Sequence, residues 1–99
     1  MKQAALEQIA PLLDVLRANP ALREVRPTAF HLDGRDFVHF HDEPGGVVAD
    51  VRLTRGVVRM RVSTDPEQAE LLERIDECLS TLDSRVRDRQ RRDRHRSGR

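Results

Sequence analysis

The chain has no tryptophan or tyrosine, only three phenylalanines and a single cysteine. A core with so few aromatic residues has to be mainly aliphatic and modest, built from about two packed layers of secondary structure. Cys78 has no disulfide partner within the chain, which fits a reducing compartment, and we interpret it as a small buried apolar residue. The apolar runs are far shorter than the ~20 residues that cross a bilayer, and residues 1–10 lack the apolar core of a secretory leader. We therefore expect a cytoplasmic protein with no membrane partner.

Several signatures of catalysis are also missing from the sequence. No serine stands in a nucleophile elbow, no glycine-rich loop is suited to a phosphate, and no paired-cysteine motif is present. The main hydrolase, nucleotide-binding and zinc-ribbon patterns are thereby excluded. These absences favour a non-enzymatic protein with no cofactor.

Charge is divided unevenly along the 99 residues. Residues 85–99 hold eight arginines against two aspartates, a net charge of +6, so residues 1–84 carry a net charge of −5. No hydrophobic residue follows Val86, and the segment after it cannot bury surface. We predict one domain over residues 1–86 and a basic Arg-rich tail over residues 87–99, either a frayed helix or disordered.

Two segments have the periodicity of amphipathic helices. In the first, apolar residues recur at intervals of three and four, at Leu6, Ile9, Leu13 and Leu16. Pro11 interrupts this segment, which predicts either a helix start near residue 10 or a kink. In the second, Asp65, Pro66 and Gln68 have the spacing of a helix start with a capping box.

The second helix continues into a narrow apolar seam. Its members follow at intervals of three and four: Leu72, Ile75, Leu79, Leu82 and Val86. Such a seam usually packs on a sheet, and the alternative is pairing with a second copy, which would make a homodimer through the C-terminal helix.

Between the helices, alternating β-rich segments predict a four-stranded antiparallel meander over residues 25–32, 35–41, 47–53 and 57–62. The predicted fold is therefore α+β, with an N-terminal and a long C-terminal amphipathic helix covering one face of the sheet.

The dipeptide Asp33-Gly34 predicts a two-residue hairpin turn, which would pair His31 with Asp36 and Phe30 with Phe37. In that register neither face of the hairpin is purely apolar. One side gathers Phe30, Leu32, Phe37, His39 and His41, and the other gathers Ala29, His31, Asp36, Val38 and Phe40. The pattern leaves open which side is buried.

The segment FHLDGRDFVHFH, followed by ADVRL at residues 49–53, resembles the luciferase-domain family of small, mostly uncharacterised proteins. The matching positions are Gly34, Arg35, His39, His41 and Asp50, with residues 65–82 as the closing helix. The resemblance covers about residues 20–82, and the family's insert after Leu53 is missing. It implies the fold alone, with no established reaction or cofactor.

His39 and His41 lie two apart on a predicted strand, so both imidazoles project to the same side. Asp50 on the next strand, or Asp42 or Glu43 in the loop, could add a third ligand for a divalent metal. We predict a domain that binds a ligand or partner on this sheet face. The alternative is a metal-dependent or acid/base enzyme that uses His39, His41 and Asp50.

Secondary candidates are Arg35 and the pair His31 and Asp36, in which the carboxylate would orient the ring for acid/base work. In the predicted register His31 faces away from His39, and only a β-bulge would reverse it.

The tail supplies a different hypothesis, a nucleic-acid accessory that neutralises phosphates. Its candidate residues are Arg87, Arg89, Arg91, Arg92, Arg94 and Arg96. The acidic body and the absence of interleaved aromatic residues favour a solvated helix end instead.

Overall fold

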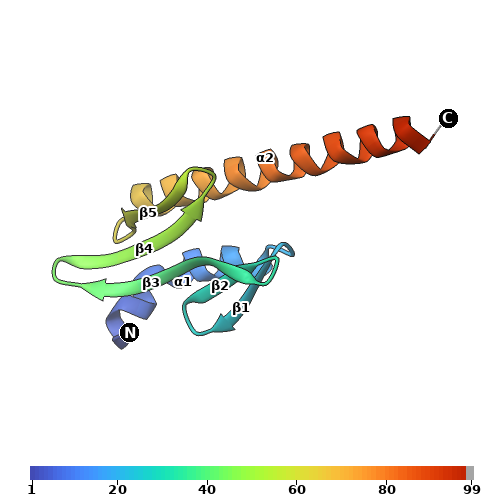
Figure 1. Ribbon diagram of the computed structural model, residues 1–99. Coiled ribbons are helices and arrows are strands. Elements are labelled where there is room, and N and C mark those ends of the chain that lie inside the picture. The colour runs from blue at the N-terminus through green and yellow to red at the C-terminus, as the bar shows by residue number, and fades with distance from the viewer. Residues whose placement is uncertain (98–99) are drawn as a thin grey trace.

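The computed structural model describes the backbone of residues 1–97 and the side chains of residues 1–82. The order of elements is α1 (Gln3–Ala18), β1 (Leu22–Arg26), β2 (Ala29–Leu32), β3 (Arg35–Glu43), β4 (Gly46–Leu53), β5 (Gly56–Arg61) and α2 (Asp65–Ser97). The five strands form one antiparallel sheet in chain order (Figure 1). The predicted α+β fold is confirmed, but the prediction of four strands is wrong. Within residues 1–97, neither helix combines the length and the apolar composition that a membrane span requires.

The fifth strand comes from a turn inside the segment predicted as one strand. The chain reverses at Pro27 and Thr28, so β1 and β2 pair with each other instead of forming one long strand. Proline holds its own φ in the range that a tight turn needs, and Thr28 adopts a φ of 65°. Periodicity does not reveal this turn, because a threonine in the left-handed region is rare.

A β-bulge changes the predicted register of the hairpin between β2 and β3. The turn at Asp33-Gly34 forms with positive φ at both residues, and His31 pairs with Asp36 as predicted. Phe30, however, pairs with Val38, so the predicted pairing of Phe30 with Phe37 is wrong. The additional residue on β3 lets two consecutive apolar side chains enter the core, an arrangement that strict alternation does not allow.

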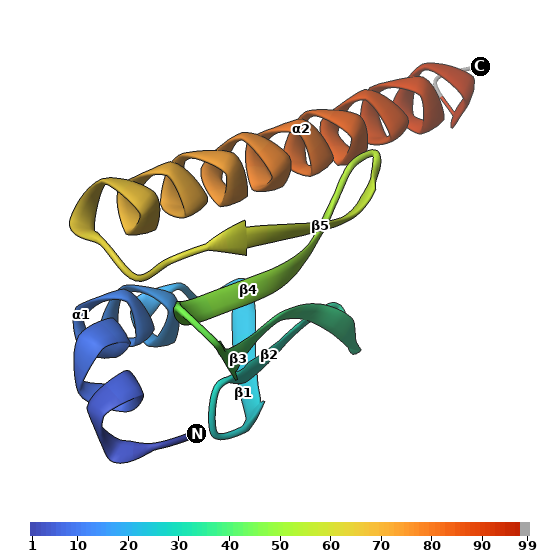
Figure 2. The ribbon, with the colours of Figure 1, turned by 90° about the vertical axis from the view of Figure 1, so that its left-hand side faces the viewer.

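Both helices pack on the same face of the twisted sheet, as predicted (Figure 2). The core between them and the strands is aliphatic, with three buried phenylalanines: Ile9, Leu12, Leu13, Leu16, Phe30, Phe37, Val38, Phe40, Val47, Ala49, Val51, Val62, Leu71 and Ile75. Cys78 is buried at its edge, in agreement with the sequence interpretation. The core therefore includes Phe37, Val38 and Phe40, and the opposite face of β3 carries His39 and His41.

The start of α2 differs in detail from the predicted capping box. The reciprocal cap is made by Thr64 and Glu67, since the Thr64 hydroxyl accepts from the Glu67 amide and the Glu67 carboxylate accepts from the Thr64 amide. Gln68 is instead buried, and its amide donates to the carbonyl oxygens of Gln8 and Val62. This side chain ties α1, the end of β5 and α2 together.

Beyond the sheet, α2 continues as a straight helix to Ser97 (Figure 1). The helical backbone thus covers most of the segment that we predicted to fray or to be disordered. The candidate arginines of the tail lie outside the residues whose side chains are described, and their role stays a prediction.

Candidate functional site

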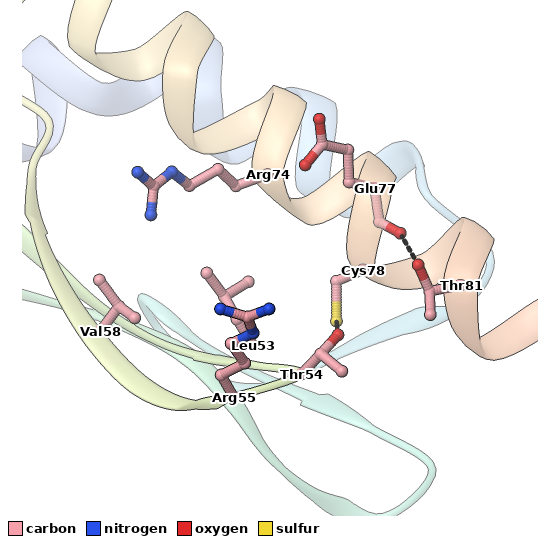
Figure 3. Close-up of a pocket in the computed structure, with 8 residues that line it drawn as sticks. All are labelled: Leu53, Thr54, Arg55, Val58, Arg74, Glu77, Cys78 and Thr81. Carbon is pink, nitrogen blue, oxygen red and sulfur yellow. Dashed lines mark hydrogen bonds between the residues drawn. The ribbon is translucent and has the colours of Figure 1, made fainter.

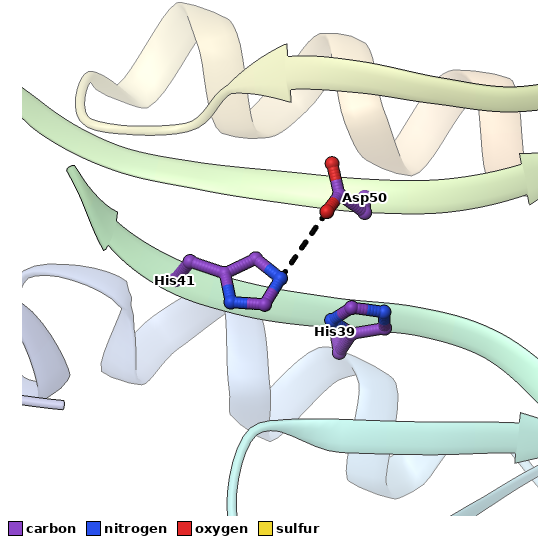
Figure 4. Close-up of side chains that lie close together, drawn as sticks. All are labelled: His39, His41 and Asp50. Carbon is purple, nitrogen blue, oxygen red and sulfur yellow. Dashed lines mark ion pairs between the residues drawn. The ribbon is translucent and has the colours of Figure 1, made fainter.

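The sheet face turned away from the helices carries a row of polar side chains from three adjacent strands. His39 on β3 pairs with Asp50 on β4, and Asp50 pairs in turn with Arg59 on β5. Directly paired residues project to the same face of a sheet, and His41 joins them because it lies two residues from His39. In Figure 4, both helices lie behind the sheet and the histidine and aspartate side chains lie in front of it.

The structure brings together His39, His41 and Asp50, which is one of the third residues that the sequence left open. A nitrogen of each ring and a carboxylate oxygen lie within 4.8 Å of one another. The two rings meet edge to face, with their centroids 4.6 Å apart and their planes at 84°. Each of the three residues is half-buried, so the cluster is open to solvent on one side.

The Nε2 atom of His41 lies 3.2 Å from Oδ2 of Asp50 (Figure 4). The ring is not oriented to form a hydrogen bond across this distance, and among the described residues Nε2 has no hydrogen-bond partner although it is shielded from solvent. The side chain as a whole is 39% exposed. A buried nitrogen without a partner has lost its water without a replacement, which is unfavourable unless something else binds it.

Arg59 is the residue of this site that the sequence interpretation missed. Its Nε lies 2.9 Å from Oδ1 of Asp50 and its Nη2 lies 3.1 Å from Oδ2, a bidentate pair. This arrangement lowers the pKa of Asp50, mainly through the hydrogen bonds from Arg59 and then through the charge of Arg59, with smaller contributions from His41 and His39. The signal that could have found it is the register of β4 and β5, in which Asp50 and Arg59 occupy paired positions.

The β-bulge brings a second pair to the same face. Ala29 pairs with His39, and His31 lies two residues further along β2, so His31 shares the face of His39. Its Nε2 lies 2.7 Å from Oδ1 of Asp36, as the predicted pairing requires. His31 and Asp36 do not belong to the three-residue cluster. Arg35 stands at the far end of the same hairpin, beside Leu32 and Phe37.

A shallow hollow of about 250 Å³ adjoins the two histidines of the cluster. Its wall includes Thr28 and Ala29, which belong to the turn and strand that the four-strand prediction did not separate. A small ligand bound to the imidazoles would therefore contact β2 and the turn before it.

No family model, no curated protein and no solved structure matches this chain. The resemblance to the luciferase-domain family accordingly stays a prediction. The geometry of the site itself has to carry the functional argument.

Proposed function

We propose that this chain is a small binding domain that holds a divalent transition-metal ion between His39, His41 and Asp50. The observation that carries the proposal is the Nε2 atom of His41, which is shielded, has no hydrogen-bond partner among the described residues and lies beside a carboxylate. Imidazole and carboxylate are the ligands of Zn²⁺ sites that keep an open position.

The distances are close to those that coordination needs. Ligand atoms at ~2.0–2.1 Å from a tetrahedral ion stand about 3.3 Å apart, and Nε2 of His41 already lies 3.2 Å from Oδ2 of Asp50. The third ligand atom lies within 4.8 Å, so a rotation of the His39 ring would complete the set. Arg59 lowers the pKa of Asp50 and so keeps this carboxylate ionised, as a metal ligand has to be, but it also binds both carboxylate oxygens and would have to release one of them to the ion.

The three residues are each half-buried, so an ion held between them would keep an open side, which supports a role in binding. A small ligand or a partner protein could supply the fourth donor from the side of the 250 Å³ hollow. Binding needs only this geometry, whereas a reaction would also need a positioned proton donor or acceptor. We therefore favour a non-enzymatic role over the metal-dependent enzyme.

The test is a titration of chelator-free protein with Zn²⁺, followed by isothermal calorimetry. We expect one ion per chain for the wild type and no specific binding for His39→Ala/His41→Ala. His31→Ala is the matched control, because it removes an imidazole from the same face outside the cluster. Equal binding by wild type and double variant would refute the proposal.

Partners of α2 form a separate proposal, which rests on the distribution of charge in the sequence. Residues 65–84 of this helix carry seven acidic residues and one arginine, and residues 85–97 carry seven arginines and two aspartates. An antiparallel pair of α2 helices would set each acidic half against the basic half of the other copy, which supports a homodimer more than nucleic-acid binding. Sedimentation of full-length chain and of a chain ending at Leu82 tests this: a dimer of the full chain alone, weakened by salt, is expected. A full-length monomer that binds DNA instead would favour the nucleic-acid accessory.

We also propose a cytoplasmic location and membership of the luciferase-domain family. The single unpaired cysteine supports the location, and the residues of the sequence resemblance support the family.

A further inference from the structure

A hollow of about 430 Å³ lies on the helix side of the sheet, away from the histidines. It opens between α2 and the turn that joins β4 to β5 (Figure 3). Leu53, Val58 and Cys78 give it an apolar floor, and the Thr54 hydroxyl lies 3.8 Å from the Cys78 sulfur. The chain has no tryptophan or tyrosine, and its three phenylalanines are buried elsewhere, so no aromatic ring fills this space.

Two guanidinium groups stand over this floor from opposite walls. Arg55 comes from the turn and Arg74 comes from α2 (Figure 3). Within the part of the chain whose side chains are described, Arg55 has no ion pair, and the one ion pair of Arg74 is with Glu70, at 3.6 Å along the helix. Glu77 is the one carboxylate among the lining residues, so two positive charges face one negative charge.

The open space continues beyond the first hollow. A second hollow of about 460 Å³ shares Leu53, Thr54 and Cys78 with it and adds the apolar residues Phe37 and Leu82. Its far wall is charged and includes two carboxylates, Asp33 and Asp36. Each volume lies within the ~300–1,000 Å³ of sites that bind small molecules. The floor suits an extended alkyl body more than a compact ion.

We propose that this hollow binds a small amphipathic anion, with its carboxylate or phosphate between Arg55 and Arg74 and its alkyl body over Leu53 and Cys78. Guanidinium groups match the planar, bidentate geometry of carboxylate and phosphate oxygens. Apolar burial of the body supplies the rest of the affinity. The site is independent of the metal cluster, since the two lie on opposite faces of the sheet.

Cys78 provides the readout, because it is the only thiol of the chain and forms part of the floor. When the octanoate concentration is ten times the Kd of the octanoate complex, about a tenth of the protein is free of ligand. Alkylation of Cys78 by iodoacetamide is then expected to slow about tenfold. Octyl phosphate tests the other head group, and 1-octanol tests the apolar body alone. Arg55→Gln/Arg74→Gln should abolish the protection by octanoate, and Arg23→Gln/Arg26→Gln, which removes two guanidinium groups from β1, should retain it.

Calorimetry of octanoate binding to the same variants checks the result without the thiol. The proposal is overturned if neither anion protects the cysteine, if 1-octanol protects it as well as octanoate does, or if the variant lacking both guanidinium groups remains protected. Circular dichroism establishes that this variant is folded, as expected for two exposed side chains.

Discussion

The pH dependence of Zn²⁺ affinity is the most demanding prediction for the cluster. Imidazole binds a metal only in its neutral form, so protons compete with the ion for each histidine ligand. With two imidazole ligands, lowering the pH by one unit should weaken the affinity for Zn²⁺ by up to ~100-fold at the acid end of the profile.

Asp50 should add no third proton over this range. Arg59 lowers the pKa of Asp50 below the free value of 3.8, so this carboxylate is ionised before the metal arrives. Calorimetric Kd values from about pH 5 to pH 7.5 should give a slope of log Kd against pH approaching −2 at the acid end. His41→Ala should retain at most weak binding with a slope near −1. A flat profile, or a slope near −3, would refute the assignment of two imidazoles and one ionised carboxylate.

Arg59 competes with the metal for Asp50, which gives the site a second diagnostic. Arg59→Gln removes a positive charge beside the ion, so Zn²⁺ should bind more tightly. Arg61→Gln, on the same strand and face, is the matched control. In the metal-free state, Arg59→Gln should also lower the free energy of unfolding. The lowered pKa of Asp50 stabilises the folded protein above pH 3.8, and this contribution disappears as the pH falls through the pKa of the folded state. Unchanged affinity in Arg59→Gln would contradict the geometry of the cluster.

Three further predictions concern the fold that positions the site. Ile75 is 1% exposed, and Ile75→Ala should lower the free energy of unfolding by about 2–5 kcal/mol in urea denaturation. Val57 is 63% exposed, and Val57→Ala should change this free energy by less than ~0.5 kcal/mol. Equal effects of the two substitutions would mean that α2 does not pack as described. Thr28→Gly should raise the free energy of unfolding by about 0.5–1 kcal/mol, because glycine adopts a φ of 65° without the cost that a β-branched residue incurs. A lower free energy of unfolding in this variant would argue against the turn. Gly46→Ala should destabilise the fold more than Gly34→Ala. Both glycines have positive φ, but only a Cβ at position 46 would meet a serine side chain. A smaller loss of stability at Gly46 would contradict the packing at that end of β4.

Periodicity predicted the elements whose apolar residues face one side throughout. The helix seam ending in Leu79 and Leu82 and the alternation from Val47 to Leu53 needed no knowledge of the tertiary structure. The turn at Thr28 and the bulge at Phe37 were missed because each departs from the local preference, and tertiary packing decides both. A β-branched residue in the left-handed region and two consecutive core residues on one strand leave no periodic signal.

The candidate cluster was predictable in part for the same reason. His39 and His41 share a face by strand geometry alone, and Asp50 follows if the two strands align. Placing Arg59 beside Asp50 requires knowledge of the register between β4 and β5. The missing hydrogen bond at Nε2 of His41 depends on the rotamer of that ring. Strand register and side-chain rotamers are three-dimensional properties. The sequence therefore indicates the three candidate ligands but does not reveal that Arg59 competes with the metal for Asp50.

The most direct test of the metal proposal is the anomalous diffraction of a crystal grown with Zn²⁺, measured at the zinc absorption edge. A single peak at ~2.0–2.2 Å from nitrogens of His39 and His41 and from an oxygen of Asp50 is the predicted result. A peak at other residues, or none at this cluster while Arg59 still holds Asp50, would contradict it.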